Sequence, residues 1–343
     1  MGPKTSRTTP CPDLIVGDPR ERGDLRALAA LRHRGPVGSV RREHSVRDVE
    51  AGRGPDGHVL VAVGASGVPE AALTYAVTEA SRAGVGVHLV HVVPALGDVP
   101  AEERSRLETV GTYRLQIATR CARERSGGAV EVTSATAHGP VVEALLGASS
   151  SARLVVIERP ALVVLERDPA PSVTRGLAAR AAAPVVTVPA VWRGPEADRA
   201  GSWTARRDRA PEEPRPPVVV ASIDDPSHSR VVIGAAMAAS ESLDARLRFV
   251  HSWWHADGEA EPVDGVDDQV LSPRRAAEVL VEVSRGSELI VTARRAGEDD
   301  ARALSPATRA ALYEAACPVL VVADSQPTQV LASRRRLRLV RGA

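Results

Sequence analysis

The side chains best able to do chemistry in this sequence stand in small groups that follow apolar runs. His251, His255 and Asp257 lie close enough together in the sequence to suggest a metal site. Zinc needs three or four ligands that converge on one point, and this spacing does not require convergence. The segment is therefore interpreted as the end of a strand, with Trp253 covering the edge of the core.

The sequence contains no nucleophile in a recognisable catalytic motif. Gly64–Gly67 differs from the Gly-x-Ser-x-Gly elbow, because Val68 stands where that motif requires its last glycine. His91 and His138 have no serine or aspartate partner at motif spacing. The sequence therefore predicts that the protein is not an enzyme.

Hydroxyl and guanidinium groups next to predicted helices and strands are the remaining candidates for ligand binding. Ser172 and Thr174 begin a predicted helix, where they act either as caps or as ligands. Arg294 and Arg295 follow a predicted strand, and they either attract an anion or belong to a solvated basic loop. Spacing alone does not decide between these alternatives.

The composition argues against several classes of partner. A net charge of +1 gives no general attraction to nucleic acid or to an anionic membrane, and arginine-rich residues 334–341 are interpreted as a solvated tail. Aromatic residues make up 2% of the chain, too few for a site that stacks bases. Three widely separated cysteines, without a CxxC pair or a long apolar segment, predict a cytoplasmic protein with no disulfide framework and no membrane span.

Apolar runs of strand length alternate with amphipathic helical stretches throughout the chain, which indicates parallel sheets covered by helices. In the first half, strands are predicted at 59–63, 85–93, 130–136, 154–157 and 185–188, and helices at 69–82, 101–125, 140–149 and 172–182. In the second half, strands are predicted at 218–223, 246–251, 269–271, 289–292 and 319–322, and helices at 230–240, 273–283 and 308–316. The second half leaves no room for a long helix between 251 and 270, so it is a shortened copy.

This repetition divides the chain into five predicted parts. They are a disordered N-terminal arm (1–57), a first domain (58–190), a linker (191–216), a shortened second domain (217–323) and a basic C-terminal tail (324–343).

The ordered motifs of both halves resemble the universal stress protein family. That family shows a strand leading into Asp-Gly-Ser, a second strand ending in Val-His, a Gly-x-Pro-x-x-Ala-Leu-Leu helix start and a closing Cys-Pro-Val-Leu-Val-Val strand. The corresponding segments are Val59–Ser66 and Val218–Asp225, Val90–His91 and Val250–His251, Gly139–Leu146, and Cys317–Val322.

The resemblance implies two flavodoxin-like parallel-sheet domains in tandem, of the adenine nucleotide alpha hydrolase-like type. It also implies that they pack against each other as an intramolecular pseudo-dimer, with a homodimer as a further possibility. The expected activity is a stress-response or regulatory role that works through conformation and a protein partner of unknown identity, without catalysis.

Members of the family that bind ATP carry a glycine signature after the fourth strand, which lets backbone N–H groups approach the phosphates. In the first copy Glu158, Ala161 and Pro171 replace its glycines, and Gly64 replaces the acidic residue after the first strand. We therefore expect no cofactor; the alternative is ATP or AMP in a divergent site of the second copy. The residues that the resemblance offers for such binding are Ser66, Ser172, Thr174, Asp224, Arg295 and Ser305.

Overall fold

The structure is a computed structural model, and the residues that it describes are 54, 56–64, 67–94, 100–159, 172–194, 216–223, 229–252, 268–272, 274–295 and 302–323. Several predictions fall outside this part of the chain. They concern the N-terminal arm up to residue 53, Ser66, Asp224, Trp253, His255, Asp257, residues 195–215 of the linker and the tail at 324–343.

The first repeat consists of five strands and four helices among the described residues. In chain order they are β1 (His58–Val63), α2 (Glu70–Ala83), β2 (Val87–Pro94), α3 (Ala101–Ser126), β3 (Val132–Gly139), α4 (Val141–Ser149), β4 (Ala152–Arg159), α5 (Val173–Arg180) and β5 (Val185–Pro189).

The second repeat follows the same order with one helix fewer among the described residues. Its elements are β6 (Val218–Ile223), α7 (Ser229–Leu243), β7 (Arg246–Ser252), β8 (Gln269–Ser272), α8 (Ala276–Ser284), β9 (Leu289–Arg294), α9 (Pro306–Glu314) and β10 (Val319–Ala323). The described residues include no counterpart of α3 between β7 and β8; residues 253–267 of this connection lie outside the described part of the chain, so the predicted shortening stays a prediction.

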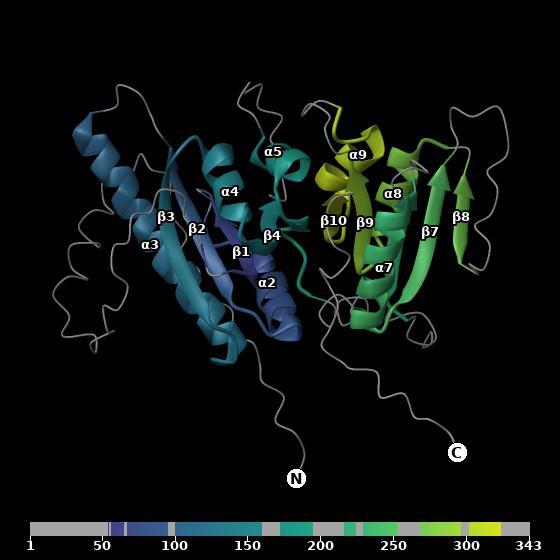
Figure 1. The fold of residues 1–343 in the computed structure, drawn as a ribbon, viewed down its shortest axis with the longest axis horizontal. Coiled ribbons are helices and arrows are strands. Elements are labelled where there is room, and N and C mark those ends of the chain that lie inside the picture. The colour runs from purple at the N-terminus through teal and green to yellow at the C-terminus, as the bar shows by residue number, and fades with distance from the viewer. Residues whose placement is uncertain are drawn as a thin grey trace, which may run out of the picture. The chain divides into compact units, whose positions relative to one another are not determined.

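All ten strands belong to one sheet in the order β3-β2-β1-β4-β5-β10-β9-β6-β7-β8. Figure 1 shows β3 and β8 at its two ends. Neighbouring strands are parallel except β5 and β10, which pair antiparallel through Val186 and Leu320 and thereby join the two repeats. The predicted α/β fold with a mostly parallel sheet is confirmed.

The strands are rich in valine because helices bury both faces of a parallel sheet. On one face of the first repeat, Leu145 of α4 and Leu177 of α5 pack against Leu60, Val90 and Val155. On the other face, α2 and α3 cover β1 and β2. In the second repeat α8 and α9 cover the face that corresponds to α4 and α5, and Leu280 and Leu312 are fully buried there.

The first helix of each repeat ends at a residue in the left-handed conformation. Gly84 has φ of 66° after α2, and Asp244 has φ of 49° after α7. Glycine adopts this conformation without steric cost, and a short polar residue such as aspartate tolerates it. The two ends are therefore equivalent, and they fix the alignment of one repeat on the other.

Three details differ from the sequence-based predictions. Trp192, assigned to the linker, is buried, and its ring centroid lies 5.7 Å from that of Tyr75 in α2. Helix α9 begins earlier than predicted, because Ser305 caps it and Pro306 suits its first turn. Cys121 is disulfide-bonded, which cysteine spacing could not reveal, whereas Cys317 is a free, buried thiol.

No helix among the described residues is long and apolar enough to cross a membrane.

Candidate functional site

In the first repeat, β1 and β4 lie side by side, but their following connections lead to opposite ends of the sheet. Ligands of open α/β sheets bind at such a switch point, in the crevice outside the carboxyl ends of the strands. Two features meet there: helix α2, which follows β1, and Glu158, which stands near the end of β4.

The Glu158 carboxylate caps the N-terminus of α2. Its Oε2 accepts hydrogen bonds from the backbone N–H groups of Ala71 at 2.8 Å and Ala72 at 3.2 Å. Pro69, at the N-cap position, offers no side-chain hydrogen bond. The first N–H groups of a helix favour an anion, and here the chain supplies that anion from a strand distant in sequence.

The position of Glu158 inside the crevice also affects its ionisation. Burial raises the pKa of this carboxyl above its ordinary value, while the hydrogen bonds from Ala72 and Ala71 oppose the increase. Glu70 raises the pKa further and Arg193 lowers it. Desolvation therefore outweighs the stabilising effect of the helix N-terminus on the charged form.

The predicted hydroxyl residues of the first repeat stand at the start of α5. The Oγ of Ser172 accepts hydrogen bonds from the Arg175 N–H at 3.4 Å and from the Tyr313 hydroxyl at 2.9 Å. Thr174 is half-buried in the first turn of the same helix. Ser172 is thus a helix cap, one of its two predicted roles. It also bonds to α9 of the second repeat, and that contact was not predicted from the sequence.

In the second repeat, hydroxyl groups of the chain satisfy the start of α9. The Oγ of Ser305 accepts a hydrogen bond from the Thr308 N–H at 3.0 Å. The hydroxyls of Thr308 and Thr292 are 2.7 Å apart, and both residues are fully buried. Ala293 stands at the position in β9 that matches Glu158 in β4, so this crevice lacks the corresponding carboxylate.

The two arginines predicted to attract an anion or to form a basic loop have different surroundings. Arg295 is exposed, and its backbone N–H donates to the Ala303 carbonyl at 2.8 Å. Arg294, in contrast, donates from its guanidinium to the carbonyls of Ala179 and Ala181, at the end of α5. Neither interpretation holds for Arg294, because it connects the two repeats.

Arg159 has the equivalent position at the end of β4 and makes the reverse connection. Its Nη2 donates to the carbonyl of Ala315, at the end of α9. The sequence signal was available, since Arg159 and Arg294 align, but nothing in the sequence indicated that each reaches the other repeat.

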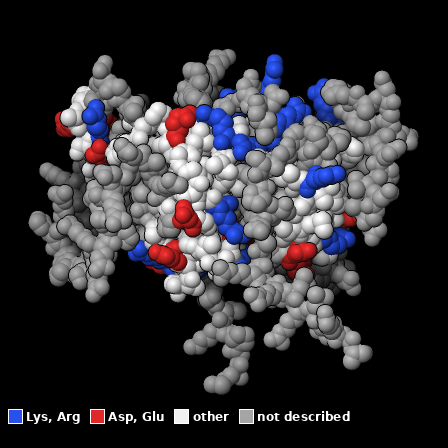
Figure 2. Space-filling model, viewed as in Figure 1, with Lys and Arg blue, Asp and Glu red and all other residues white. Residues whose placement is uncertain are grey.

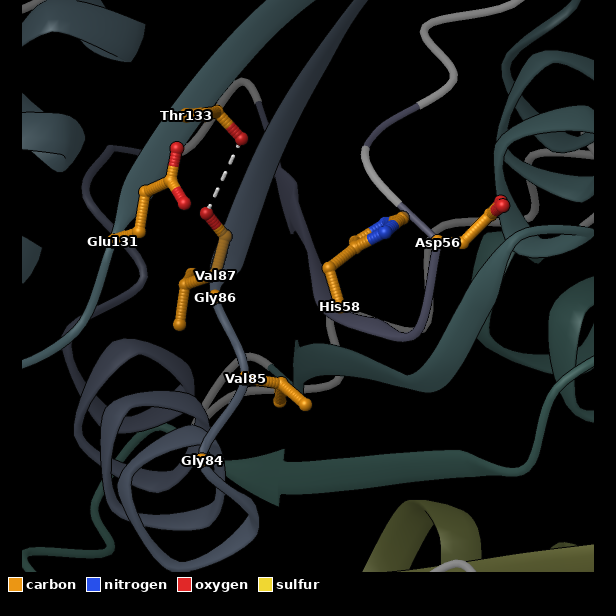
Figure 3. Close-up of a pocket in the computed structure, with 8 residues that line it drawn as sticks. All are labelled: Asp56, His58, Gly84, Val85, Gly86, Val87, Glu131 and Thr133. Carbon is orange, nitrogen blue, oxygen red and sulfur yellow. Dashed lines mark hydrogen bonds between the residues drawn. The ribbon is translucent and has the colours of Figure 1, made fainter.

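A separate pocket of about 240 Å³ lies at the other end of the strands, where β1, β2 and β3 begin. Figure 3 shows Asp56 and His58 on one side of it and Glu131 and Thr133 on the other. The ring of His58 meets that of His88 edge-on at 5.1 Å, and the His88 Nδ1 lies 2.8 Å from the Thr133 hydroxyl oxygen. In the part of the chain that the structure describes, no group of three or more His, Cys, Asp or Glu side chains could hold a metal ion.

Basic side chains gather near the carboxyl ends of the central strands, where α5 and α9 lie (Figure 1). Figure 2 shows a band of blue side chains along the part of this view where Figure 1 places the two helices. Arg175 and Arg180 belong to α5, and Arg309 belongs to α9. The Arg180 guanidinium pairs with Glu143 at 2.9 Å, so neighbouring acids offset part of this charge.

Residues 57–189 match the sequence pattern of the Universal stress protein family. This part of the chain is a universal stress protein domain. The match includes β1 through β5, and therefore the crevice that contains Glu158.

Solved structures of universal stress proteins match this chain, and the first of them, with a TM-score above 0.5, shares its fold. One from Archaeoglobus fulgidus has 12% sequence identity and a TM-score of 0.58, and the match covers 77% of this chain and 96% of that one. A putative universal stress protein from Pseudomonas aeruginosa has 12% identity and a TM-score of 0.40, over 80% and 95% of the two chains. A universal stress protein from A. fulgidus solved in complex with dAMP, a shorter chain, has 24% identity and a TM-score of 0.30, over 38% of this chain and 96% of that one. Among curated proteins, none matches significantly.

Proposed function

We propose that this universal stress protein works as a regulatory module through conformation and partner binding, without catalysis, and that its first repeat does not bind nucleotide. The main observation behind this proposal is the contact of Glu158 with the backbone N–H groups of Ala71 and Ala72. These donors are the part of the crevice best suited to an anion, and an internal carboxylate already engages them.

Electrostatics opposes the entry of a nucleotide phosphate beside this carboxylate. Two like charges about 4 Å apart repel by roughly 1 to 4 kcal/mol at effective dielectric constants of 80 to 20. Sequence adds to the effect, because Pro171 offers no N–H donor before α5 and Glu158 and Ala161 stand where the family's ATP-binding members have glycines.

The alternative function is ATP or AMP binding in the second repeat. Two observations favour it: Ala293 replaces Glu158 there, and the nearby Arg295 is exposed. Asp224 is the candidate contact for the adenosine, and it lies outside the described residues. Against this alternative, Thr308 and Ser305 already satisfy the start of α9 within the chain.

Equilibrium dialysis of the purified chain against ATP and AMP, with and without Mg²⁺, tests the proposal. Any nucleotide retained through purification is extracted and identified first. We expect no retained nucleotide and no binding at millimolar ligand. Micromolar binding would contradict the proposal, and the Asp224→Ala variant would then show whether the second repeat holds the site.

A further inference from the structure

The second repeat lacks a described helix on the face that α3 covers in the first repeat. The alignment is fixed at two points, because Val61 pairs with Leu89 as Ala221 pairs with Phe249. The left-handed residues that end α2 and α7 agree with it. Leu73 and Val77 of α2 therefore correspond to Ile233 and Met237 of α7.

In the first repeat this flank is closed. Leu73 and Val77 are buried, on the side of α2 away from Tyr75, and α3 packs against α2 and β2. The close fit is clear at Gly111 of α3, where an added Cβ would lie 2.4 Å from the ring of His91. Buried positions of α3 toward its C-terminus include Leu115, Ala118 and Ala122.

Among the described residues, the equivalent flank of the second repeat is more exposed than that of the first. Met237 is 49% exposed where Val77 is 7% exposed, and Ile233 is half-buried where Leu73 is fully buried. Leu247 and His251 of β7, which match Val87 and His91, are half-buried as well. We call this surface, formed by Ile233, Met237, Leu247 and His251, the α7–β7 face.

The charge beside this face differs from that in the first repeat. Glu70 at the start of α2 pairs with Arg125 of α3 at 2.7 Å. The position that matches Glu70 is Arg230, which is exposed at the start of α7. A helix lying where α3 lies would therefore need an acidic residue, not an arginine, at the position of Arg125, since like charges repel.

From these observations we infer that the α7–β7 face binds an amphipathic helix of a partner protein. That helix lays small and apolar side chains, at the spacing of Gly111, Leu115, Ala118 and Ala122, over Met237 and Ile233. It places a carboxylate against Arg230. The inference rests on the proposed function, because it names the kind of partner through which the module acts.

The α3 helix of a second copy does not meet these requirements. Its small and apolar stripe is already buried in its own first repeat, and its Arg125 would face Arg230. A symmetric contact between the α7 helices of two copies, with Arg230 against Glu241, is the competing arrangement, and it would make the protein a dimer in solution.

The test uses the full chain and two labelled peptides of residues 101–126 with C121A, one of them also carrying R125E. Fluorescence anisotropy should show that the R125E peptide binds at least about tenfold more tightly than the peptide that keeps Arg125, a difference of about 1.4 kcal/mol. Met237→Asp should abolish binding of both peptides. Arg230→Glu, an exposed change, should reverse the preference between them.

Three outcomes would overturn the inference. They are equal binding of the two peptides, binding that Met237→Asp leaves unchanged, and a dimer in sedimentation equilibrium that Met237→Asp converts to monomer while neither peptide binds. Circular dichroism confirms that each variant is folded. Nucleotide binding, measured separately, bears on the proposed function alone, so a failure of this surface and a failure of the proposed function are distinguishable.

Discussion

Arg159 and Arg294 end the equivalent strands β4 and β9, and each donates hydrogen bonds to the C-terminal carbonyls of the last helix in the other repeat. Arg159 reaches Ala315, and Arg294 reaches Ala179 and Ala181. A cation at a helix C-terminus satisfies carbonyls that have no partner within the helix and complements the helix dipole. Together with the β5–β10 pairing, these contacts connect the two repeats.

The two arginines should not contribute equally to stability. Both Arg294 contacts use charged N–H donors. Their loss in Arg294→Met should lower the free energy of unfolding by about 2 to 3 kcal/mol. Arg159 is buried, and its Nη1 has no hydrogen-bond partner among the described residues, so its desolvation offsets more of its gain. We therefore expect Arg159→Met to lower the free energy of unfolding by about 1 kcal/mol, as measured by urea unfolding.

Arg180→Met provides the control for this pair of variants. Arg180 pairs with Glu143 on the surface, where an ion pair contributes about 0 to 1 kcal/mol. If Arg159→Met proved more destabilising than Arg294→Met, desolvation would not offset more of the contribution of Arg159 than of Arg294, and the argument would be wrong.

The hydroxyl pair Thr292 and Thr308 should show strong coupling in a double-mutant cycle. Thr308→Val leaves the Thr292 hydroxyl buried without its partner, which should cost about 1 to 3 kcal/mol. Replacing both threonines with valine removes the donor and the acceptor together, so the double variant should lose less than the sum of the single variants. Additive losses in chemical denaturation would mean that the hydroxyls do not bond to each other.

Gly111 should not tolerate alanine, although alanine favours helices. The added Cβ would force the His91 ring to move and would disturb the bond between His91 Nδ1 and the Val63 carbonyl, which measures 2.8 Å. We expect Gly111→Ala to lower the unfolding free energy by about 1 to 3 kcal/mol. The exposed neighbour Thr112 is the control, because Thr112→Ala raises helix propensity without meeting His91. Stabilisation by Gly111→Ala would contradict the close packing.

The ionisation of Glu158 should make stability depend on pH in a defined direction. Its pKa is raised in the folded protein, so the folded state binds the proton more tightly than the unfolded state. The resulting stabilisation is complete below the unfolded pKa, about 4.3, and is lost as pH rises through the raised folded pKa. Glu158→Gln cannot ionise, and its amide oxygen can still accept from Ala71 and Ala72.

Glu158→Gln should therefore gain stability relative to the wild type as pH rises from about 4 to about 7. Unfolding free energies from urea titrations at several pH values measure the difference. Glu143→Gln, at an exposed carboxyl, is the matched control. A difference between Glu158→Gln and wild type that is independent of pH, or that shrinks with rising pH, would show that burial does not dominate at Glu158.

The sequence predicts local features of this fold well. Valine-rich runs mark β1, β4, β6 and β10, because strands buried on both faces contain few polar residues. Amphipathic spacing and the prolines Pro69 and Pro140 locate helix starts. Strand order between the repeats, and the antiparallel β5–β10 pair, depend on long-range packing that no local pattern specifies.

The candidate site could be predicted only in part, for the same reason. Ser172 is a helix cap, one of the two roles predicted for it, because the cap bond is local. Ser305, expected only as a nucleotide contact, is also a helix cap. The contact of Glu158 with α2, and the contacts of Arg159 and Arg294 with the other repeat, join residues far apart in the chain. Residue type indicated charge at these positions but not its partner.

Isothermal titration of ATP into the wild type and into Glu158→Gly tests the central claim most directly. If Glu158 takes the place of a phosphate at α2, the wild type should give no heat of binding at millimolar ATP, and Glu158→Gly should bind weakly through the freed N–H groups of Ala71 and Ala72. Micromolar binding by the wild type that Glu158→Gly leaves unchanged would contradict the account.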